Sequence, residues 1–471
     1  RVEIVRACQR CHHPLLIDPY PEFRNLVHWF DHLDLYHSEQ HSPKEMLAYL
    51  DEQYFTDLLV WYHLVWFGQS LRQNDLIQCL MKKGRLFSGT DTQQLAHLIH
   101  DTLAGLIPRY RALAASGQVE ISMTPYGHPI VPLLHDFENM RCALPDAPAP
   151  ETVAYPGGKE RNRWHMRQGL ELMEHFLGVR PQGVWLSEGG VSDDALGLLD
   201  EFDIAWTATG EGVWRNSCQE SGCTEDDVHS RRGLFSPYTH AQNSVELFFR
   251  DDGLSDLIGF EYSNWQADDA IADFIKHLGN IRTFLDEDSD KHVVSVILDG
   301  ENAWEYYPDN GASFLDGLYK ALAEEPEINV MTFSDAVESD IETREMEKLC
   351  PGSWVYGSFS TWIGEKDKNR AWELLVEAKQ AYDSVIERKV LSGEEERLAS
   401  RQLAVCEGSD WFWWFGDYNS QESVSDFEKL FRRQLRSLYR LLHLPEPPVL
   451  DVPISAGGSE GVANAGTMRR N

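Results

Sequence analysis

The sequence is short of basic residues and contains no long hydrophobic run. Its 471 residues include 42 Lys and Arg against 76 Asp and Glu, which gives a formal net charge of −34. Such an acidic surface repels phosphate groups, and this argues against nucleic acid and anionic membrane surfaces as partners. No apolar segment approaches the roughly 20 residues that span a bilayer. We therefore expect a protein that works without nucleic acid and without a membrane.

Cysteine is also scarce. The eight cysteines are irregularly spaced, so a disulfide framework is not expected and a reducing, cytoplasmic compartment is the default. Residues Cys8 to His12 match the CxxCH pattern of c-type haem attachment, but so short a pattern also arises by chance, and a cytochrome would need export and a second axial ligand. Cys218 and Cys223 have no second pair at zinc-site spacing and are interpreted as loop thiols. We expect no metal and no cofactor.

Apolar and aromatic residues, in contrast, are plentiful. The chain is 42% hydrophobic and includes 15 Trp, which is enough apolar surface to offset the conformational entropy lost on ordering. Its length corresponds to two or three domains of about 150 residues, although a single barrel can absorb about 250. A large hydrophobic core is therefore expected.

The order of predicted helices and strands indicates an α/β fold. Apolar spacing predicts helices over Tyr54–Phe67 and Asp91–Ala115. Short apolar runs then predict strands separated by helices: Val119–Met123, Gly183–Leu186, Ile204–Thr209, Val245–Phe249, Val293–Leu298 and Val330–Thr332. The alternation favours a parallel sheet, and its many repeats favour a barrel over two open sheets.

Beyond about residue 340 the pattern becomes helical. Helices with charged faces are predicted over three segments, 369–391, 394–406 and 425–442. We predict a barrel domain over residues 1–340, with a helical segment at 20–115, followed by a C-terminal helical domain over 341–450. Residues 451–471 are mostly small or polar and are predicted to form a disordered tail.

Two of the predicted strands end in an acidic residue. Glu188 ends the strand that starts at Gly183 and precedes two glycines, and Asp299 ends the strand that starts at Val293. In α/β barrels the reactive groups lie at the C-terminal ends of strands. Each acid alone is better explained by capping of the next helix. Two such acids among aromatic residues favour glycosidic chemistry, in which one carboxyl protonates the leaving oxygen and the other attacks or stabilises the oxocarbenium-like centre.

Further candidate residues lie beside these strand ends. Trp185 and Trp304 are near the two acids in sequence and offer flat surfaces for sugar rings, with core packing as the alternative. His128 follows the first predicted strand, where it can hydrogen-bond a sugar hydroxyl or a catalytic carboxylate. Arg250 directly follows Val245–Phe249. It can orient a carboxylate through a bidentate pair, although a structural salt bridge is an equal alternative.

Together these segments resemble glycoside hydrolase family 57, in particular its amylopullulanase and α-amylase-like members. The matching stretches are Gly117–Leu134, Gly183–Gly190, Leu298–Gly311, Gly352–Gly364 and Gly408–Asp417. They occur in the family's order, and the resemblance extends from about residue 17 to residue 447. A match of this extent is far more specific than any one motif.

The resemblance implies an incomplete (β/α)7 barrel followed by a C-terminal helical domain, and a retaining mechanism. It implies that Glu188 is the nucleophile and Asp299 the general acid/base, with carboxyl groups about 5–5.5 Å apart. His128 matches a histidine of the substrate cleft, and Trp362 and Asp410 fall in helical-domain segments that face the sugar. The implied substrate is an α-glucan or maltooligosaccharide with α-1,4 and also α-1,6 linkages.

The chain departs from the family pattern in two places. Family members usually carry a proline beside the glutamate, where this chain has Trp185-Leu-Ser before Glu188. The family's first motif, a His-Gln-Pro-Tyr-like segment at the end of the first strand, has no convincing counterpart. The segment Ile17–Arg24 already resembles a region downstream of that motif, so we expect the motif before Arg1. As given, the chain would then lack its opening strand and be inactive or poorly folded despite its catalytic pair.

The favoured interpretation is a retaining hydrolase of α-glucans that forms a covalent glycosyl-enzyme on Glu188. Because water and a sugar hydroxyl compete for that intermediate, a 4-α-glucanotransferase or branching enzyme is the neighbouring alternative. A carbohydrate-binding relative without turnover is a further one.

Overall fold

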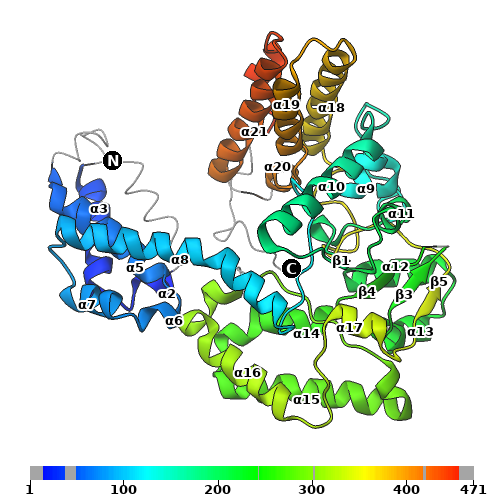
Figure 1. The fold of residues 1–471 in the computed structure, drawn as a ribbon, viewed down its shortest axis with the longest axis horizontal. Coiled ribbons are helices and arrows are strands. Elements are labelled where there is room, and N and C mark those ends of the chain that lie inside the picture. Colours follow the sequence, from blue (N-terminus) through cyan, green and yellow to red (C-terminus); the bar gives the residue numbers. More distant parts are fainter. Residues whose placement is uncertain are drawn as a thin grey trace. The chain divides into compact units, whose positions relative to one another are not determined.

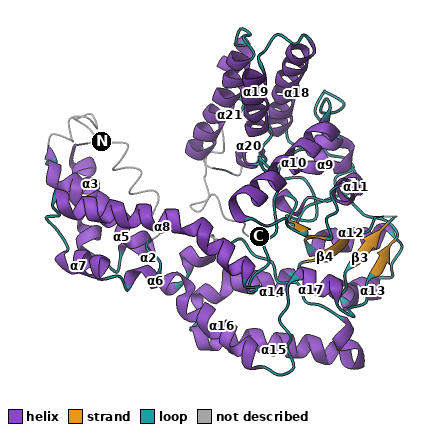
Figure 2. Ribbon diagram, in the orientation of Figure 1, coloured by secondary structure: helices purple, strands orange, loops and turns teal. Residues whose placement is uncertain are grey.

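Helices make up most of the structure, with a small sheet among them (Figure 2). The computed structural model describes residues 14–37, 49–241, 243–300, 303–416, 419 and 421–455. The haem-like pattern at Cys8 to His12 and the predicted tail beyond residue 455 lie outside this range. None of the helices in the described part of the chain combines the length and hydropathy that a membrane span requires.

The chain divides into two compact units, each made of several segments. The first unit comprises Arg1–Tyr110, Asp256–Gly279 and Leu298–Val330, and the second comprises Arg111–Ser255, Asn280–Ile297 and Met331–Asn471. The domain division predicted from the sequence, at residue 340, stays a prediction.

Helices at the N-terminal end of the first unit (Figure 1) share one hydrophobic core, to which most of them contribute buried residues. They are α2 (Pro14–Ile17), α3 (Pro21–His37), α5 (Glu52–Trp66), α6 (Gln69–Arg72), α7 (Asp75–Lys83) and the longer α8 (Gly89–Ala115). Helices α5 and α8 confirm two predicted helices. The carboxylate of Asp51 caps α5 by accepting from the amide of Tyr54 at 2.7 Å. Trp61 is 1% exposed and donates its indole N–H to the carbonyl of Gly84 at 2.7 Å.

The rest of the first unit contains short helical turns and two longer helices. They are η5 (Leu257–Glu261), η6 (Tyr262–Asn264), α15 (Ala267–Leu285, which continues into the second unit), η8 (Ala303–Tyr306), η9 (Pro308–Gly311) and α16 (Ala312–Glu324). An aromatic cluster holds them together, because the ring of Tyr307 lies 5.3 Å from the rings of both Trp304 and Phe314. The Tyr307 hydroxyl donates to the carbonyl of Ile258 at 2.6 Å.

The second unit contains a five-stranded sheet with the order β1-β2-β4-β3-β5. Its strands are β1 (Gly183–Val184), β2 (Trp206–Thr209), β3 (Tyr238–His240), β4 (Glu246–Phe249) and β5 (Arg344–Met346). All neighbours are parallel except β3 and β4. Parallel bridges add Met123 beside Val184 and Ser295 beside Arg250. The parallel pairing therefore follows chain order from Met123 through β1, β2 and β4 to Ser295.

Strands β1, β2 and β4 lie within predicted strands, whereas the other predictions hold only in part. The segments 119–123 and 293–298 each contribute a single bridge. Val330–Thr332 is not a strand, because Thr332 forms the N-terminal capping box of α17 (Phe333–Glu338) with Asp335. Strand β5 was missed because Arg344–Met346 is a charged edge strand without an apolar run.

Helices of the second unit pack around this sheet. They are α9 (Val131–His135), α10 (Gly158–Leu177), α11 (Asp193–Glu201), α12 (Glu211–Glu220), α13 (Glu225–Ser230), α14 (Asp252–Asp256) and α17. Buried residues of the strands and helices, among them Leu186, Leu196, Trp214 and Leu247, share one hydrophobic core. Helix α11 begins at Asp193, because the Ser192 hydroxyl accepts from the amide of Ala195 at 3.2 Å.

The C-terminal helices form a second core of this unit. They are α18 (Lys366–Glu387), α19 (Gly393–Cys406), α20 (Asp410–Trp414) and α21 (Gln421–Leu441), and α18, α19 and α21 lie side by side (Figure 1). The helices predicted from charged-face periodicity are therefore confirmed. The Trp372 ring stacks on the Phe412 ring with centroids 4.1 Å apart, which joins α18 to α20.

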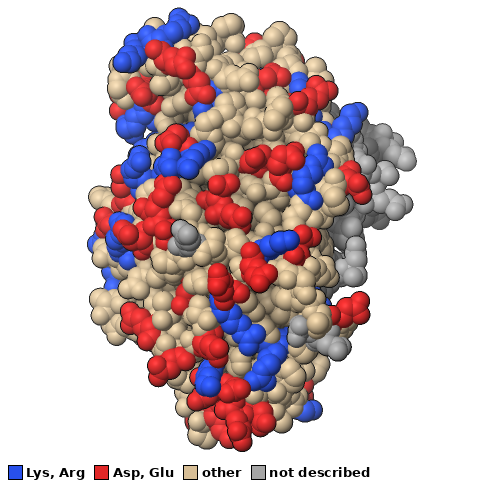
Figure 3. Space-filling model, turned by 90° about the vertical axis from the view of Figure 1, so that its right-hand side faces the viewer, with Lys and Arg blue, Asp and Glu red and all other residues tan. Residues whose placement is uncertain are grey.

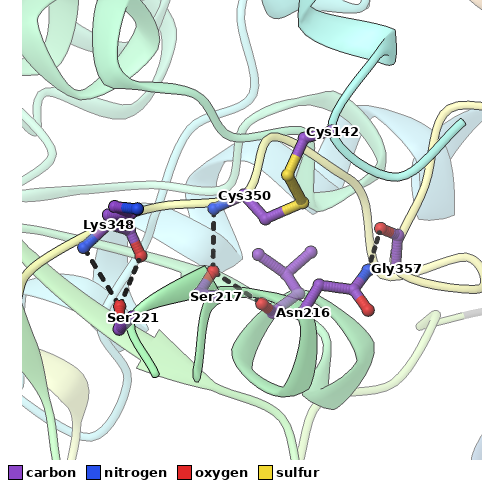
Figure 4. The surroundings of a disulfide bond; sticks show 8 residues. Cys142, Asn216, Ser217, Ser221, Lys348, Cys350 and Gly357 are labelled. Atoms are coloured by element: carbon purple, nitrogen blue, oxygen red, sulfur yellow. Dashed lines mark hydrogen bonds between the residues drawn. A yellow bond between two sulfur atoms is a disulfide. The ribbon is translucent and has the colours of Figure 1, made fainter. Parts of the chain in front are cut away.

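One disulfide contradicts the expectation drawn from cysteine spacing. Cys142 and Cys350 are bonded to each other although 208 residues separate them in sequence (Figure 4). The amide of Cys350 also donates to the Ser217 hydroxyl at 2.9 Å, which attaches this segment to α12. A single long-range pair leaves no local motif in the sequence, and this is why spacing did not reveal it.

Candidate active site

Glu188 occupies a strained turn, η3 (Ser187–Gly189), in the loop that follows β1. Its backbone has φ 59° and ψ 24°, in the left-handed region that non-glycine residues rarely adopt. The turn is tight, because the amide of Gly189 donates to the carbonyl of Leu186 at 2.7 Å, and the carbonyl of Gly189 accepts from the Thr209 hydroxyl at 2.6 Å. A side chain at Gly189 would place its Cβ 3.0 Å from the Trp185 ring. Such strain is typical of functional positions, where surrounding contacts fix an unfavourable conformation.

Trp354 fixes the Glu188 carboxylate from a distant segment. Its indole N–H donates to Glu188 Oε2 at 3.1 Å, and its backbone amide donates to the Glu188 carbonyl at 3.1 Å. A two-way backbone pairing between Gly352 and Val191 holds this segment beside the turn. Sequence reasoning placed Trp354 in a family motif but did not name it as a site residue. The signal that could have identified it was that motif.

His128 reaches the same region from the loop that follows Met123. Its backbone also has a positive φ, 55°. Its Nδ1 lies 2.8 Å from the Ser409 hydroxyl, and its carbonyl accepts from the Ser409 amide at 2.9 Å. The side chain of Ser409 therefore orients the imidazole, and Asp410 follows it at the start of α20. Ser409 was not recognised from the sequence, because its contact with His128 spans 281 residues.

Three of the predicted site residues meet at this point. One side-chain ligand atom each of His128, Glu188 and Asp410 lies within 4.8 Å of the other two. Two carboxylates and an imidazole can bind sugar hydroxyls, and the same atoms are of the types that hold a divalent metal ion. Sequence spacing indicated no such cluster, because the three residues come from three distant segments.

Arg250 supports the site through Trp354. It is 6% exposed, its Nε donates to the carbonyl of Ile297 at 2.8 Å, and its Nη1 pairs with Asp252 at 2.7 Å. Its guanidinium lies 5.5 Å from the centre of the Trp354 ring, close enough for a cation–π interaction. The salt-bridge alternative considered for Arg250 is therefore present in the structure.

The predicted tryptophans are in different surroundings. Trp185 is half-buried beside Glu188 and meets Trp354 edge to face, with ring centroids 5.3 Å apart. Trp362 has no exposed surface, and its carbonyl accepts from the Trp372 indole at 3.0 Å. Its place in the C-terminal core accounts for Trp362 by packing, and a role toward a sugar stays a prediction. Trp304 lies in the aromatic cluster of the first unit.

The two predicted catalytic acids belong to different units. Asp299 is half-buried and lies in the first unit, directly after the segment that pairs with Arg250 through Ser295. Glu188 lies in the second unit together with His128, Asp410, Trp354 and Arg250. The second unit by itself therefore assembles the surroundings of Glu188.

A strained acid at a strand end, with an imidazole and a second carboxylate beside it, suits an enzyme that acts on glycosidic bonds. Residues 16–350 match the family model of glycosyl hydrolase family 57. Because this match covers most of the chain, the protein belongs to glycosyl hydrolase family 57, and it is a glycoside hydrolase or transferase.

Solved structures resemble the fold. An α-amylase from Thermotoga maritima is 14% identical with a TM-score of 0.57, over 94% of this chain and 88% of that one. A family 57 branching enzyme from Thermococcus kodakaraensis is 15% identical with a TM-score of 0.54, over 93% and 86%. A 4-α-glucanotransferase from Thermococcus litoralis is 15% identical with a TM-score of 0.51, over 74% and 52%. At these identities the likeness is one of fold.

Proposed function

We propose that this protein cleaves α-glucans, at α-1,4 and also α-1,6 linkages, by a retaining mechanism in which Glu188 is the nucleophile. The observation that supports this most directly is the hydrogen bond from the Trp354 indole to Glu188 Oε2. A donor on one oxygen stabilises the ionised carboxylate, and attack of this carboxylate on the anomeric carbon forms the glycosyl-enzyme. One polar side-chain atom each of His128 and Asp410 lies within 4.8 Å of the Glu188 carboxylate and of the other. These two side chains then bind hydroxyls of the same glucosyl unit.

Asp299 is the proposed general acid/base, on the strength of its motif. In the first step it protonates the leaving glycosidic oxygen as the bond from Glu188 to the anomeric carbon forms. In the second step it takes a proton from water, and that water displaces Glu188 from the sugar. We expect the two carboxyl groups to be about 5–5.5 Å apart in the working enzyme, as retention requires.

The proposed architecture is an incomplete (β/α)7 barrel followed by a helical domain. The parallel pairing from Met123 through β1, β2 and β4 to Ser295 runs in chain order, as consecutive barrel strands do. Glu188 lies in the loop after β1, on the C-terminal side where barrel enzymes place their reactive groups.

An α-glucan is the proposed substrate because the similar structures include an α-amylase, a branching enzyme and a 4-α-glucanotransferase. Because an α-glucan is uncharged, its binding requires neither an acidic nor a basic surface. Figure 3 shows a face on which Asp and Glu side chains are interspersed with Lys and Arg. Hydrolysis and transfer share the glycosyl-enzyme and differ only in the acceptor, so transfer to a sugar hydroxyl is the alternative activity.

Two measurements test the proposal on the full chain. A fluorinated maltosyl fluoride, which forms the glycosyl-enzyme but slows its breakdown, should label the peptide that contains Glu188. Glu188→Gln should abolish the label and lower kcat by at least about 10³-fold. Products from a maltooligosaccharide of defined length then separate hydrolysis, which gives only shorter products, from transfer, which also gives longer ones. Unchanged turnover in Glu188→Gln would contradict the assignment, and binding without turnover would favour a carbohydrate-binding relative.

A further inference from the structure

We propose that Glu407, a wholly buried carboxylate outside the sugar site, is a positioning residue that holds the His128 loop against the segment that carries Asp410. The proposal rests on the proposed function, in which these two residues bind the glucosyl unit. Glu407 acts through His165, and neither residue contacts the substrate.

Glu407 is fully hydrogen-bonded although it is 0% exposed. Arg161 donates from Nε at 2.9 Å and from Nη2 at 2.7 Å, the Tyr155 hydroxyl donates at 2.6 Å, and His165 Nε2 lies 2.8 Å away. Burial acts to raise the pKa of Glu407, but Arg161 and His165 outweigh it and lower that pKa to about 2. The carboxylate is therefore a fixed negative charge inside the protein.

His165 links the Glu407 carboxylate to the loop before His128. Its other ring nitrogen, Nδ1, is hydrogen-bonded to the carbonyl of Tyr126, and its own carbonyl accepts from the Tyr126 amide at 3.1 Å. A carbonyl and a carboxylate are both hydrogen-bond acceptors, so the imidazole lies between one acceptor on each segment. The bridge runs from Glu407 to Tyr126, two residues before His128.

The two segments also approach each other closely at two glycines. A Cβ at Gly127, whose φ is 75°, would lie 2.9 Å from the carbonyl of Ala404, and a Cβ at Gly408 would lie 3.0 Å from the carbonyl of Gly127. The contacts of Ser409 with His128 follow immediately. Residues 126–128 are thus clamped to 404–409 on both sides of the loop, and Asp410 is the next residue.

A buried charge of this kind is seldom the most stabilising way to fill a core, since apolar residues of the same volume often serve as well or better. The network instead fixes the position of the His128 loop relative to the segment that carries Asp410. Misplacement of substrate-binding groups by about 1 Å can cost up to about 10²-fold in rate. Glu407 is suited to prevent such a shift between His128 and Asp410.

The test compares two disrupting variants with a matched control. Glu407→Gln and His165→Gln remove the bridge, whereas Tyr155→Phe removes a different hydrogen bond to the same carboxylate and leaves the bridge intact. At a temperature where all variants remain folded, we expect the first two to lower kcat/KM on a maltooligosaccharide by about 10- to 100-fold. Tyr155→Phe should stay within about threefold. Equal losses in all three variants would overturn the proposal, since they would indicate general destabilisation.

A double-mutant cycle with His128→Asn distinguishes positioning from stability. If Glu407 acts through His128, Glu407→Gln should change kcat/KM by less than about threefold in the His128→Asn background, because the group it positions is already absent. If the double variant lost kcat/KM by the product of the two single-variant factors, the proposal would be contradicted.

Hydrogen exchange measures the clamp without any substrate, and so separates this proposal from the function itself. In Glu407→Gln the amides of Tyr126 and Ser409 should lose protection, and in Tyr155→Phe they should keep it. Unchanged exchange in Glu407→Gln would overturn the clamp even in an active enzyme. Loss of protection in a protein that has no activity on α-glucans would retain the clamp and refute the proposed function.

Discussion

The indole N–H of Trp354 donates to Oε2 of Glu188 at 3.1 Å, and the backbone amide of the same tryptophan donates to the Glu188 carbonyl. Both bonds come from a segment 166 residues away in sequence. Arg250 lies against the Trp354 ring, and Trp185 meets it at its edge. Trp354 therefore fixes both the backbone and the carboxylate of the proposed nucleophile, while its own ring is held from two sides.

Trp354→Phe should lower kcat/KM by about 10- to 100-fold, because a hydrogen bond to a charged group is worth about 1.5–3 kcal/mol. The ring would keep most of its packing, so we expect KM to change less than kcat. The measurement is steady-state kinetics on a maltooligosaccharide. The control is Trp206→Phe, which removes an indole donor from Glu120 (2.8 Å), a carboxylate outside the proposed site. Similar kinetic losses in the two variants would contradict a specific role for Trp354.

Gly189→Ala should destabilise the turn that carries Glu188. Gly189 has φ 59°, and a Cβ there would lie 3.0 Å from the Trp185 ring and 3.4 Å from the Cα of Thr209. We expect a decrease of about 1–3 kcal/mol in the free energy of unfolding, together with a lower kcat. Denaturant unfolding and kinetics measure the two effects.

The matched control for that substitution is Gly197→Ala in α11. No atom lies within 4 Å of a Cβ at this position, and alanine is the better helix former by about 0.5–1 kcal/mol. Gly197→Ala is therefore expected to stabilise the protein without changing its kinetics. If both glycine variants had the same effect, the close contacts at Gly189 would not be the cause.

Local patterns predicted those parts of the fold that are determined locally. Helices α5, α11 and α19 have apolar periodicity and capping residues within a few positions of one another, and their bounds follow from these. Glu188 was predicted because an acid followed by two glycines at a strand end is a local pattern too.

The remaining features depend on contacts between distant segments. Nothing near Glu407 in sequence indicates that Arg161 and His165 will surround it. Trp362 is an aromatic residue in a family motif, and such a residue has the same sequence pattern whether it faces a sugar or fills a core, as it does here. The partners of Glu407 depend on long-range pairing and the role of Trp362 depends on burial. Local sequence patterns indicate neither.

The disulfide between Cys142 and Cys350 should contribute to stability under oxidising conditions. Its closed loop is long, with a sequence separation of 208 residues, so the bond restricts the unfolded chain strongly. Cys142→Ser should lower the free energy of unfolding by about 2–4 kcal/mol relative to the oxidised protein. Cys79→Ser, at an exposed free thiol, is the control and should have little effect. Equal stability of the reduced and oxidised proteins would contradict the prediction.

The pair formed by His240 and Asp193 should make stability depend on pH. His240 Nε2 lies 2.9 Å from Asp193 Oδ1, and its Nδ1 lies 2.7 Å from the carbonyl of Met346 in β5. The hydrogen bond to Asp193 raises the pKa of His240 above its ordinary value, against the opposing effect of burial. A raised pKa means that the folded state holds the proton more tightly than the unfolded chain does. The stabilisation is therefore fully present below about pH 6.5, the ordinary pKa of histidine, and is lost as the pH rises through the folded-state value.

His240→Gln should consequently destabilise the protein more at pH 5.5 than at pH 8.5, by about 1 kcal/mol or less because Asp193 is exposed to solvent. Asp193→Asn removes the partner and keeps the histidine, and it should reduce the same pH dependence. Denaturant unfolding across this range provides the measurement. If His240→Gln lost the same stability at both pH values, packing of the ring against β5, and not its charge, would account for the contribution of His240.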